Sequence, residues 1–398
     1  MRKGNKCKSI SSMKTPRLYF GATAIGEKLY VVGGCFTMSD DLSSAEVYDR
    51  RSNMWSTLPD MNEYRNGCGV ASINGKIYVI GGSDHGKELA SCEMFDPDTN
   101  VWTAIPDMEE AREGCAACAV GDKLYAIGGG NDNGWLSSVE VFDTITQEWS
   151  FLPSMKNGGC GCAAVSVGNK IYVFGGDDDY YECLSSAEVY DVTTQEWTKL
   201  PDMKEERYSV AATTVGNRIY VLGGNYYTNA CEVFDTFSNS WSSPIPDIKV
   251  QRYGCAAIAV GPYIYVIGGD NKGTCTASVE MFEISMPFLY PTDDNYVTVE
   301  GGYRSPKLLE NLCIDQFCRS LPDLDGDIPP GYPEYIVNTI LESLANHGVL
   351  NATKMKVFRN YKLDQLPQTG IRGKRKQKLL SQFEPLLEKK CKQFKSNF

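Results

Sequence analysis

Two short cysteine pairs, Cys115-x-x-Cys118 and Cys160-x-Cys162, are the first candidates for chemistry, because thiolates at such spacings can bind zinc. A structural zinc site uses four ligands, usually from two Cys-x-x-Cys pairs or from one pair and two histidines. Neither pair has a histidine nearby or a second pair at a suitable spacing, and both stand among Gly and Ala. We therefore expect these cysteines to pack as small apolar side chains, and we predict neither a metal nor a cofactor.

The chain contains fifteen cysteines, and those in runs of small residues are Cys68, Cys115, Cys118, Cys160, Cys162 and Cys255. This placement favours reduced thiols in a cytosolic or nuclear compartment over a disulfide framework. Residues 1–14 are polar and basic, and no run approaches the roughly 20 apolar residues that cross a bilayer. We expect a soluble, cytoplasmic protein without a membrane partner. The basic run at 374–378 leaves a nuclear location open, although a solvated helix face is the favoured interpretation.

An apolar strand stopped by two glycines recurs six times in the first 300 residues, and these copies must position any site. The glycine pairs are Gly33/Gly34, Gly81/Gly82, Gly128/Gly129, Gly175/Gly176, Gly223/Gly224 and Gly268/Gly269, at intervals of 48, 47, 47, 48 and 45 residues. A Glu-x-aromatic-acid step follows each pair, at Glu46, Glu93, Glu140, Glu188, Glu232 and Glu280. Six residues after the acid, the first five copies have tryptophan, at Trp55, Trp102, Trp149, Trp197 and Trp241. This regularity predicts a repeat protein.

The pattern resembles the kelch repeat, whose period of about 50 residues builds one four-stranded propeller blade. The resemblance covers residues 15 to 285 and implies an all-β six-bladed kelch propeller, which we place at residues 1–286. A small sheet with two apolar faces must stack on its neighbours, and we expect the tryptophans to pack blade against blade. Small residues at 67–71, 114–118, 161–165 and 254–257 indicate the innermost strands, which crowd round the central axis.

The two ends of the repeat region suggest how the ring closes. The sixth copy has Leu289 where the others have tryptophan, and Ser9 to Met13 resembles the segment Trp55 to Met61. We predict that this N-terminal segment supplies the outer strand of the last blade. The alternative, in which residues 286–290 fill that position, is equally compatible with the sequence.

Some propellers of this kind are enzymes. Kelch-like copper oxidases need two histidines and two tyrosines around the metal, and the propeller region contains one histidine, His85. We therefore predict a protein that is not an enzyme. A carbohydrate-active propeller stays open as the less favoured alternative.

Charge divides unevenly along the chain. Of 39 Lys and Arg and 50 Asp and Glu, residues 305–398 hold 15 and 10, which leaves 24 and 40 for the first 304 residues. Because nucleic-acid binding needs a positive face, we expect no nucleic-acid partner for the acidic propeller.

The segments after the glycine pairs vary in length and carry aromatic and acidic residues. We predict that this loop face binds a protein segment, with a basic peptide favoured by the acidic side chains. The candidate residues are Tyr19, Phe36, Asp84, Trp135, Asp178, Tyr180, Tyr181, Tyr226, Tyr227 and Asp270. Loop polarity that only maintains solubility is the alternative for any single Asp.

The propeller also resembles those of ubiquitin-ligase adaptors, in which these loops and the turns into the inner strands form the substrate face. The turn positions lie two residues after a recurrent arginine at Arg17, Arg65, Arg112, Arg207 and Arg252. They are Tyr19, Gly67, Gly114, Ser209 and Gly254, whereas several relatives place arginine there to hold acidic ligands. The fourth repeat has Gly159 in place of the recurrent arginine.

Beyond the repeats we predict a linker at 287–305 and a small α-helical module at 306–398. The stripe Leu309, Cys313 and Phe317 resembles the BC box that binds elongin. Downstream, a second pattern resembles the cullin box and contains Ile328, Pro329, Tyr332 and Ile336. A helical cap that packs on the propeller is the alternative for this module.

Together these resemblances imply a substrate receptor of an elongin/cullin-type ubiquitin ligase, with elongin B/C, a cullin and a protein substrate as partners. The alternative is a kelch interaction scaffold, cytoskeletal or other, without a ligase link.

Overall fold

The computed structural model describes residues 7–37, 39–178, 182–225, 228–242 and 247–284, together with short strands at 296–298 and 304–306. The chain divides into two compact units, Met1–Ile284 and Ser285–Phe398, so the first unit ends just before the predicted boundary at residue 286. In the second unit β31 (Tyr296–Thr298) pairs with β32 (Arg304–Pro306), where we predicted a linker. The predicted BC box and cullin box lie outside the described residues.

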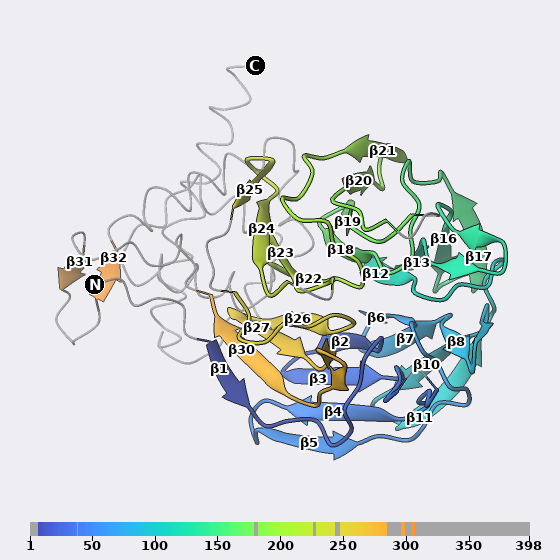
Figure 1. Ribbon diagram of the computed structural model, residues 1–398, viewed down its shortest axis with the longest axis horizontal. Coiled ribbons are helices and arrows are strands. Elements are labelled where there is room, and N and C mark those ends of the chain that lie inside the picture. Colours follow the sequence, from blue (N-terminus) through green and yellow to red (C-terminus); the bar gives the residue numbers. More distant parts are fainter. Residues whose placement is uncertain are drawn as a thin grey trace, which may run out of the picture. The chain divides into compact units, whose positions relative to one another are not determined.

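The first unit is a ring of six four-stranded antiparallel sheets, which confirms the predicted six-bladed propeller (Figure 1). Blade 1 contains β2 (Gly21–Ile25), β3 (Lys28–Val32), β4 (Ala45–Asp49) and β5 (Met54–Thr57), and blade 2 contains β6 (Gly69–Ile73), β7 (Lys76–Ile80), β10 (Cys92–Asp96) and β11 (Val101–Ile105). Blade 3 contains β12 (Ala116–Val120), β13 (Lys123–Ile127), β16 (Val139–Asp143) and β17 (Glu148–Leu152), and blade 4 contains β18 (Ala163–Val167), β19 (Lys170–Phe174), β20 (Ala187–Asp191) and β21 (Glu196–Lys199).

Blade 5 contains β22 (Ala211–Val215), β23 (Arg218–Leu222), β24 (Cys231–Asp235) and β25 (Ser240–Ser242), and blade 6 contains β26 (Ala256–Val260), β27 (Tyr263–Ile267), β30 (Val279–Glu283) and β1 (Cys7–Ile10). Three short hairpins project from the loops between the second and third strands of blades 2, 3 and 6. They are β8 (Ser83–Asp84) with β9 (Lys87–Glu88), β14 (Gly130–Asn131) with β15 (Gly134–Trp135), and β28 (Asp270–Asn271) with β29 (Thr274–Cys275).

The N-terminal strand β1 completes blade 6, as predicted. It runs antiparallel to β30, with Cys7 opposite Phe282 and Ile10 opposite Val279, and Figure 1 shows the two strands side by side. Met13 is buried in the core between blades 6 and 1, and the carbonyl of Ser11 accepts a hydrogen bond from Trp55 Nε1 at 2.9 Å. The alternative closing segment, residues 286–290, lies outside the described residues.

The blades are held together by apolar faces that meet between neighbouring sheets. The second strand of each blade is buried at four successive positions, because neighbouring blades cover both of its faces. Between blades 2 and 3, for example, Ile80 and Cys92 pack in one cluster with Leu124 and Phe142.

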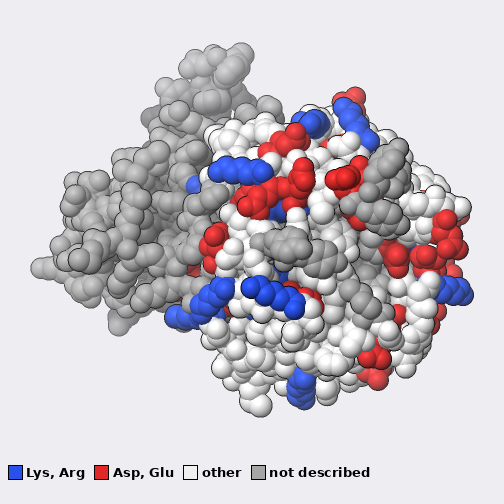
Figure 2. Space-filling model, in the orientation of Figure 1, with Lys and Arg blue, Asp and Glu red and all other residues white. Residues whose placement is uncertain are grey.

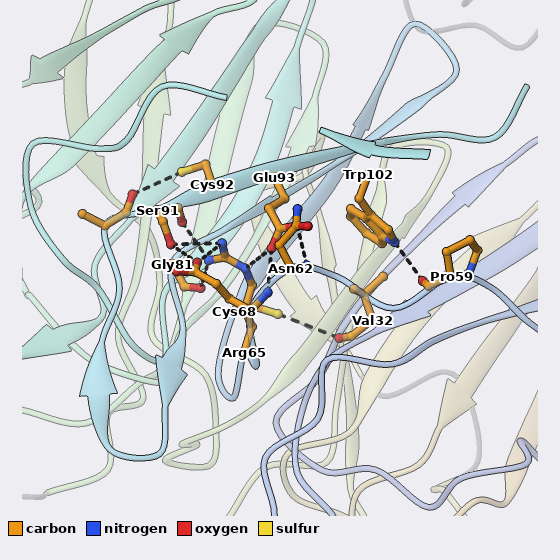
Figure 3. Close-up of polar contacts among 12 residues, drawn as sticks. Val32, Pro59, Asn62, Arg65, Cys68, Gly81, Ser91, Cys92, Glu93 and Trp102 are labelled. Atoms are coloured by element: carbon orange, nitrogen blue, oxygen red, sulfur yellow. Dashed lines mark hydrogen bonds and ion pairs between the residues drawn. The ribbon is translucent and has the colours of Figure 1, made fainter. Parts of the chain in front are cut away.

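The recurrent tryptophans link one blade to the preceding one, as predicted. Trp102 Nε1 of blade 2 donates to the carbonyl of Pro59 at 2.9 Å (Figure 3). The centroid of its ring lies 4.9 Å from that of the Phe95 ring. Trp149, Trp197 and Trp241 make the same bond to Pro106, Pro153 and Pro201.

The small-residue segments differ from prediction at their first two residues. Residues 67–68 and their equivalents form a turn, and the inner strand begins only at the third residue of the run. The cysteines of these segments pack as predicted. Cys68, Cys115, Cys118, Cys162 and Cys255 are buried, Cys160 is half-buried, and all are free thiols. Burial raises the pKa of the Cys68 and Cys162 thiols to about 12, which keeps both thiols protonated.

Candidate functional site

The turns that lead into the six inner strands meet round one cavity of about 360 Å³, which we call the mouth. Every blade contributes to its lining. The lining residues are Tyr19, Phe20, Asn66, Gly67, Cys68, Glu113, Gly114, Cys115, Cys160, Gly161, Cys162, Tyr208, Ser209, Val210, Gly254 and Cys255. The mouth is therefore the place where one ligand can touch all six repeats.

Five backbone hydrogen bonds between neighbouring turns fix the shape of the mouth. At the central position of each turn φ is positive, with values of 54° at Tyr19, 66° at Gly67, 60° at Gly114, 68° at Gly161, 51° at Ser209 and 58° at Gly254. The N–H groups of Tyr19, Gly67, Gly114, Gly161 and Gly254 donate to the carbonyls of Gly254, Tyr19, Gly67, Gly114 and Ser209, at 2.8 to 3.1 Å. Left-handed backbone is unfavourable for Tyr and Ser, so the surrounding ring holds both residues in place.

Two tyrosines and one glutamate give the mouth its side-chain character. The hydroxyls of Tyr19 and Tyr208 lie 3.1 Å apart, and the ring of Tyr19 also meets that of Tyr253 edge to face, with centroids 6.0 Å apart. Burial raises the pKa of Glu113, which lines the mouth. The mouth thus combines aromatic surface with one acidic side chain, Glu113.

In five of the six blades, an arginine that precedes the turn is buried beside the glutamate of the Glu-x-aromatic-acid step. Arg65 in blade 2 is fully buried and donates to the carbonyls of Gly81 at 2.9 Å and Ser91 at 2.7 Å (Figure 3). Its Nε contacts Glu93 Oε1 at 3.2 Å. Arg17, Arg112, Arg207 and Arg252 occupy the same place in blades 1, 3, 5 and 6. Each ion pair fixes a turn of the mouth to its own sheet.

The glycine pairs make this buried unit possible. Gly81 has φ of 59°, and a Cβ there would lie 2.4 Å from the carbonyl oxygen of Arg112 in the next blade. Only glycine permits this approach of two backbones.

Blade 4 differs, because Gly159 replaces the arginine. Its glutamate, Glu188, is nevertheless only 4% exposed. The same blade buries Asp177, which is 7% exposed and whose Oδ1 has no hydrogen-bond partner among the described residues. Burial raises the pKa of Asp177 to about 6.

The predicted loop residues differ in their exposure and in their contacts. Phe36 is exposed, and Asp84 is half-buried in the β8–β9 hairpin. Trp135 lies over Gly130 of its own hairpin, and Asp178 Oδ1 accepts from the N–H of Glu182 at 3.1 Å. Asp270 is buried and accepts from the N–H of Gly273 at 2.7 Å, which gives it a role in its own turn. Tyr180, Tyr181, Tyr226 and Tyr227 lie outside the described residues.

The sequence analysis missed the lining residues that come directly after the recurrent arginine or its replacement, among them Glu113, Cys160 and Tyr208. Their fixed place in the repeat was a usable signal. Our prediction used only the second position after the arginine.

Acidic side chains are prominent on the face of the propeller that Figure 2 draws. Figure 2 shows Asp and Glu grouped over its upper half and right edge, with Lys and Arg scattered among them. Asp41 ties two of the loops together, because its Oδ2 accepts from the N–H of His85 at 2.7 Å. Within the described residues, no group of three or more His, Cys, Asp and Glu is arranged to hold a metal ion. Nor does the described part of the chain include a helix long and apolar enough to cross a membrane.

The chain is similar to known kelch proteins along most of its propeller. The model of the KLHDC2/KLHL20/DRC7 Kelch-repeats domain matches residues 5–161 and 114–286. The Arabidopsis thaliana F-box/kelch-repeat protein At1g26930 is 38% identical over 84 residues, which are 21% of this chain and 20% of that protein. Kelch-like protein 41a of Danio rerio is 38% identical over 82 residues, which are 20% of this chain and 13% of that protein.

The chain therefore spans a fifth or less of these two relatives. The structure of YjhT has the same fold, with a TM-score of 0.59 and 16% identity over 68% of this chain and 95% of that one. With six blades, the recurring motifs and the match over both halves of the ring, the chain belongs to the KLHDC2/KLHL20/DRC7 Kelch-repeats domain family.

Proposed function

We propose that the chain is a non-catalytic substrate receptor that binds a segment of a target protein at the mouth and its surrounding loops. The observation that carries this proposal is the mouth itself. Six turns, fixed to one another by backbone bonds and to their sheets by buried ion pairs, present Tyr19, Tyr208 and Glu113 to one cavity. A preformed site of this kind binds without the cost of ordering loops.

Binding of peptides by the full chain tests this part of the proposal. We expect Lys- and Arg-rich peptides to bind better than Glu-rich peptides of equal length in fluorescence anisotropy, with an affinity that falls as salt rises. Glu113→Gln should weaken binding about two- to fivefold, because it removes one partly screened charge. Glu148→Gln, on the exposed outer strand β17, is the matched control and should have no effect. Preference for the acidic peptides would contradict the proposal.

The finer proposal concerns the tail. We propose that the stripe Leu309, Cys313 and Phe317 binds elongin C, and that Ile328, Pro329, Tyr332 and Ile336 bind a cullin, so that the chain delivers its substrate to a ubiquitin ligase. The order of the two motifs after a substrate-type propeller supports this assignment. The small size of Cys313 matters because a larger side chain there would hold the helix of the motif and its partner helix apart.

Co-purification of the full chain with elongin B/C tests the tail proposal. We expect a stable complex, which Leu309→Ala combined with Cys313→Phe abolishes. Leu344→Ala, outside both motifs, serves as the control and should leave the complex intact. Failure of the unaltered chain to bind elongin B/C would leave the interaction scaffold without a ligase link as the better interpretation.

A further inference from the structure

Blade 4 keeps the groups that hold an arginine in the other blades. One backbone bond beside them is retained, since Gly175 N–H donates to the carbonyl of Ser186 at 3.0 Å, as Gly128 N–H donates to that of Ser138 at 3.2 Å in blade 3. In blade 3 the carbonyls of Gly128 and Ser138 accept from Arg112 at 2.9 and 3.0 Å. We call Gly175 O, Ser186 and the carboxylate of Glu188 the blade 4 acceptor set.

The carboxylate of Glu188 is also held as its counterparts are. It accepts from the N–H groups of Asn157 at 2.8 Å and Lys156 at 3.2 Å. Glu140 in blade 3 accepts from two equivalent N–H groups and in addition from Arg112 at 2.9 Å. The guanidinium that completes this arrangement is missing from blade 4, where residue 159 is glycine.

Among the described residues, blade 4 buries its glutamate without the arginine that accompanies the equivalent glutamate in the other five blades. Five blades pair one buried arginine with one buried glutamate, whereas blade 4 buries Glu188 and, among the described residues, no arginine. A buried aspartate does not distinguish blade 4, because Asp41 and Asp270 are buried in blades 1 and 6 as Asp177 is here. A buried carboxylate without a cation is costly, and a cation that enters recovers much of that cost.

The position that the guanidinium occupies in the other blades faces solvent at its outer end. In blades 2 and 3 the guanidinium is covered by a carboxylate two residues earlier, Glu63 or Glu110, which contacts Nη2 at 2.7 or 2.9 Å and is itself 39% or 34% exposed. Asn157 stands at this position in blade 4 and is exposed. The N–H of Asn157 donates to the Glu188 carboxylate at 2.8 Å, so the exposed side chain next to the acceptor set is an amide in place of a carboxylate.

We propose that the blade 4 acceptor set binds the guanidinium of an arginine side chain that belongs to the bound protein segment. The inference rests on the proposed function for the source of that arginine and adds the side chain that is recognised. A planar guanidinium places several N–H groups toward two carbonyls and a carboxylate at once, as five internal arginines do in this chain, whereas the compact ammonium of lysine does not match this pattern.

The first test uses Nα-acetyl-arginine amide as the probe in an NMR saturation-transfer titration of the full chain. Nα-acetyl-citrulline amide has nearly the same shape without charge, and Nα-acetyl-lysine amide has charge without the planar fork. We expect both to bind about tenfold more weakly than the arginine probe, or worse, because each loses charged hydrogen bonds. Equal binding of the arginine and citrulline probes overturns the inference.

The second test supplies the acceptor set with an arginine from the chain itself, at residue 159. Gly159→Arg should abolish binding of the arginine probe, whereas Gly159→Ala is the matched control, since both variants bring the same Cβ to within 2.7 Å of Asp177 O. We also expect Gly159→Arg to melt at a higher temperature than Gly159→Ala, because the internal guanidinium meets the acceptor set. Probe binding that persists in Gly159→Arg contradicts the proposal.

A third comparison covers the case in which Gly159→Arg does not fold. Glu188→Gln should lose probe binding and keep or raise the melting temperature, whereas Glu140→Gln in blade 3 should lower it, because Arg112 loses its partner there. A lowered melting temperature in Glu188→Gln would show that the carboxylate already has an internal cation. Probe binding is independent of elongin, so loss of the elongin complex alone leaves this inference standing.

Discussion

The phenolic oxygens of Tyr19 and Tyr208 lie 3.1 Å apart, although blade 6 stands between the turns that carry them. Gly254 of blade 6 makes this contact possible, because a Cβ there would lie 3.0 Å from the ring of Tyr19. The two tyrosines therefore narrow one side of the mouth and couple blade 1 to blade 5.

A double-mutant cycle of Tyr19→Phe and Tyr208→Phe measures this coupling. Each substitution removes one hydroxyl and keeps the ring. We expect an interaction energy of about 0.5 to 1.5 kcal/mol in urea unfolding, the range of a single partly buried hydrogen bond. Strictly additive effects would show that the two hydroxyls do not interact in solution.

The buried arginine units should dominate the stability of the ring. Arg112→Met leaves Glu140 buried without its cation, and we expect a loss of about 3 to 5 kcal/mol in the free energy of unfolding. Lys123→Met is the matched control, because its pair with Asp143 at 3.5 Å is exposed and is worth less than about 1 kcal/mol. Similar losses in the two variants would contradict the role assigned to burial.

Removal of the closing strand tests the ring closure. Deletion of residues 1–14 removes β1, the burial of Met13 and the acceptor of Trp55, and should lower the melting temperature substantially. A shorter deletion, of residues 1–6, leaves all three features intact and controls for the loss of chain. An unchanged melting temperature after the longer deletion would mean that β1 adds nothing to stability.

Asp177 should make stability depend on pH. Its pKa in the folded protein is about 6, above the usual 3.8, so between pH 4 and 6 the folded state keeps a proton that the unfolded state has lost. Stability therefore falls as pH rises through this window. Asp177→Asn should be more stable than the unaltered protein at pH 7, by about 1 kcal/mol after allowance for solvent screening, and equal to it below pH 4.

Asp143 provides a control of opposite sign. Hydrogen bonds from the N–H groups of Ile145 and Thr146 lower its pKa, so its contribution is present at neutral pH and is lost as pH falls. Asp143→Ala should therefore be less stable at pH 7. If Asp177→Asn behaves in the same way, Asp177 is paired in solution.

The repeat pattern predicted the blades, their order and even the closing strand, because each depends on local signals that recur. Ser11 to Met13 resembles the segments that precede the remaining inner strands, and it packs as those segments do. The buried arginines were harder to interpret. Their recurrence was visible, but arginine is usually exposed, and its partner glutamate lies about 28 residues away on another strand.

The shape of the mouth was predictable only in part. Four of its six central turn positions are glycine, which signals positive φ, whereas Tyr19 and Ser209 take the same conformation without that signal. Tertiary hydrogen bonds impose it on them, and such bonds leave no trace in the local sequence.

Pairing of β1 with β30 also has a kinetic consequence. The two strands lie at opposite ends of the propeller in the sequence, so their pairing closes the longest loop that the domain can form. This closure has the largest entropic cost and is therefore slow. Until it happens, β30 offers an open edge to any strand nearby. An equivalent strand from a second copy of the chain has the right sequence for that edge, so concentrated refolding favours exchanged dimers over single rings.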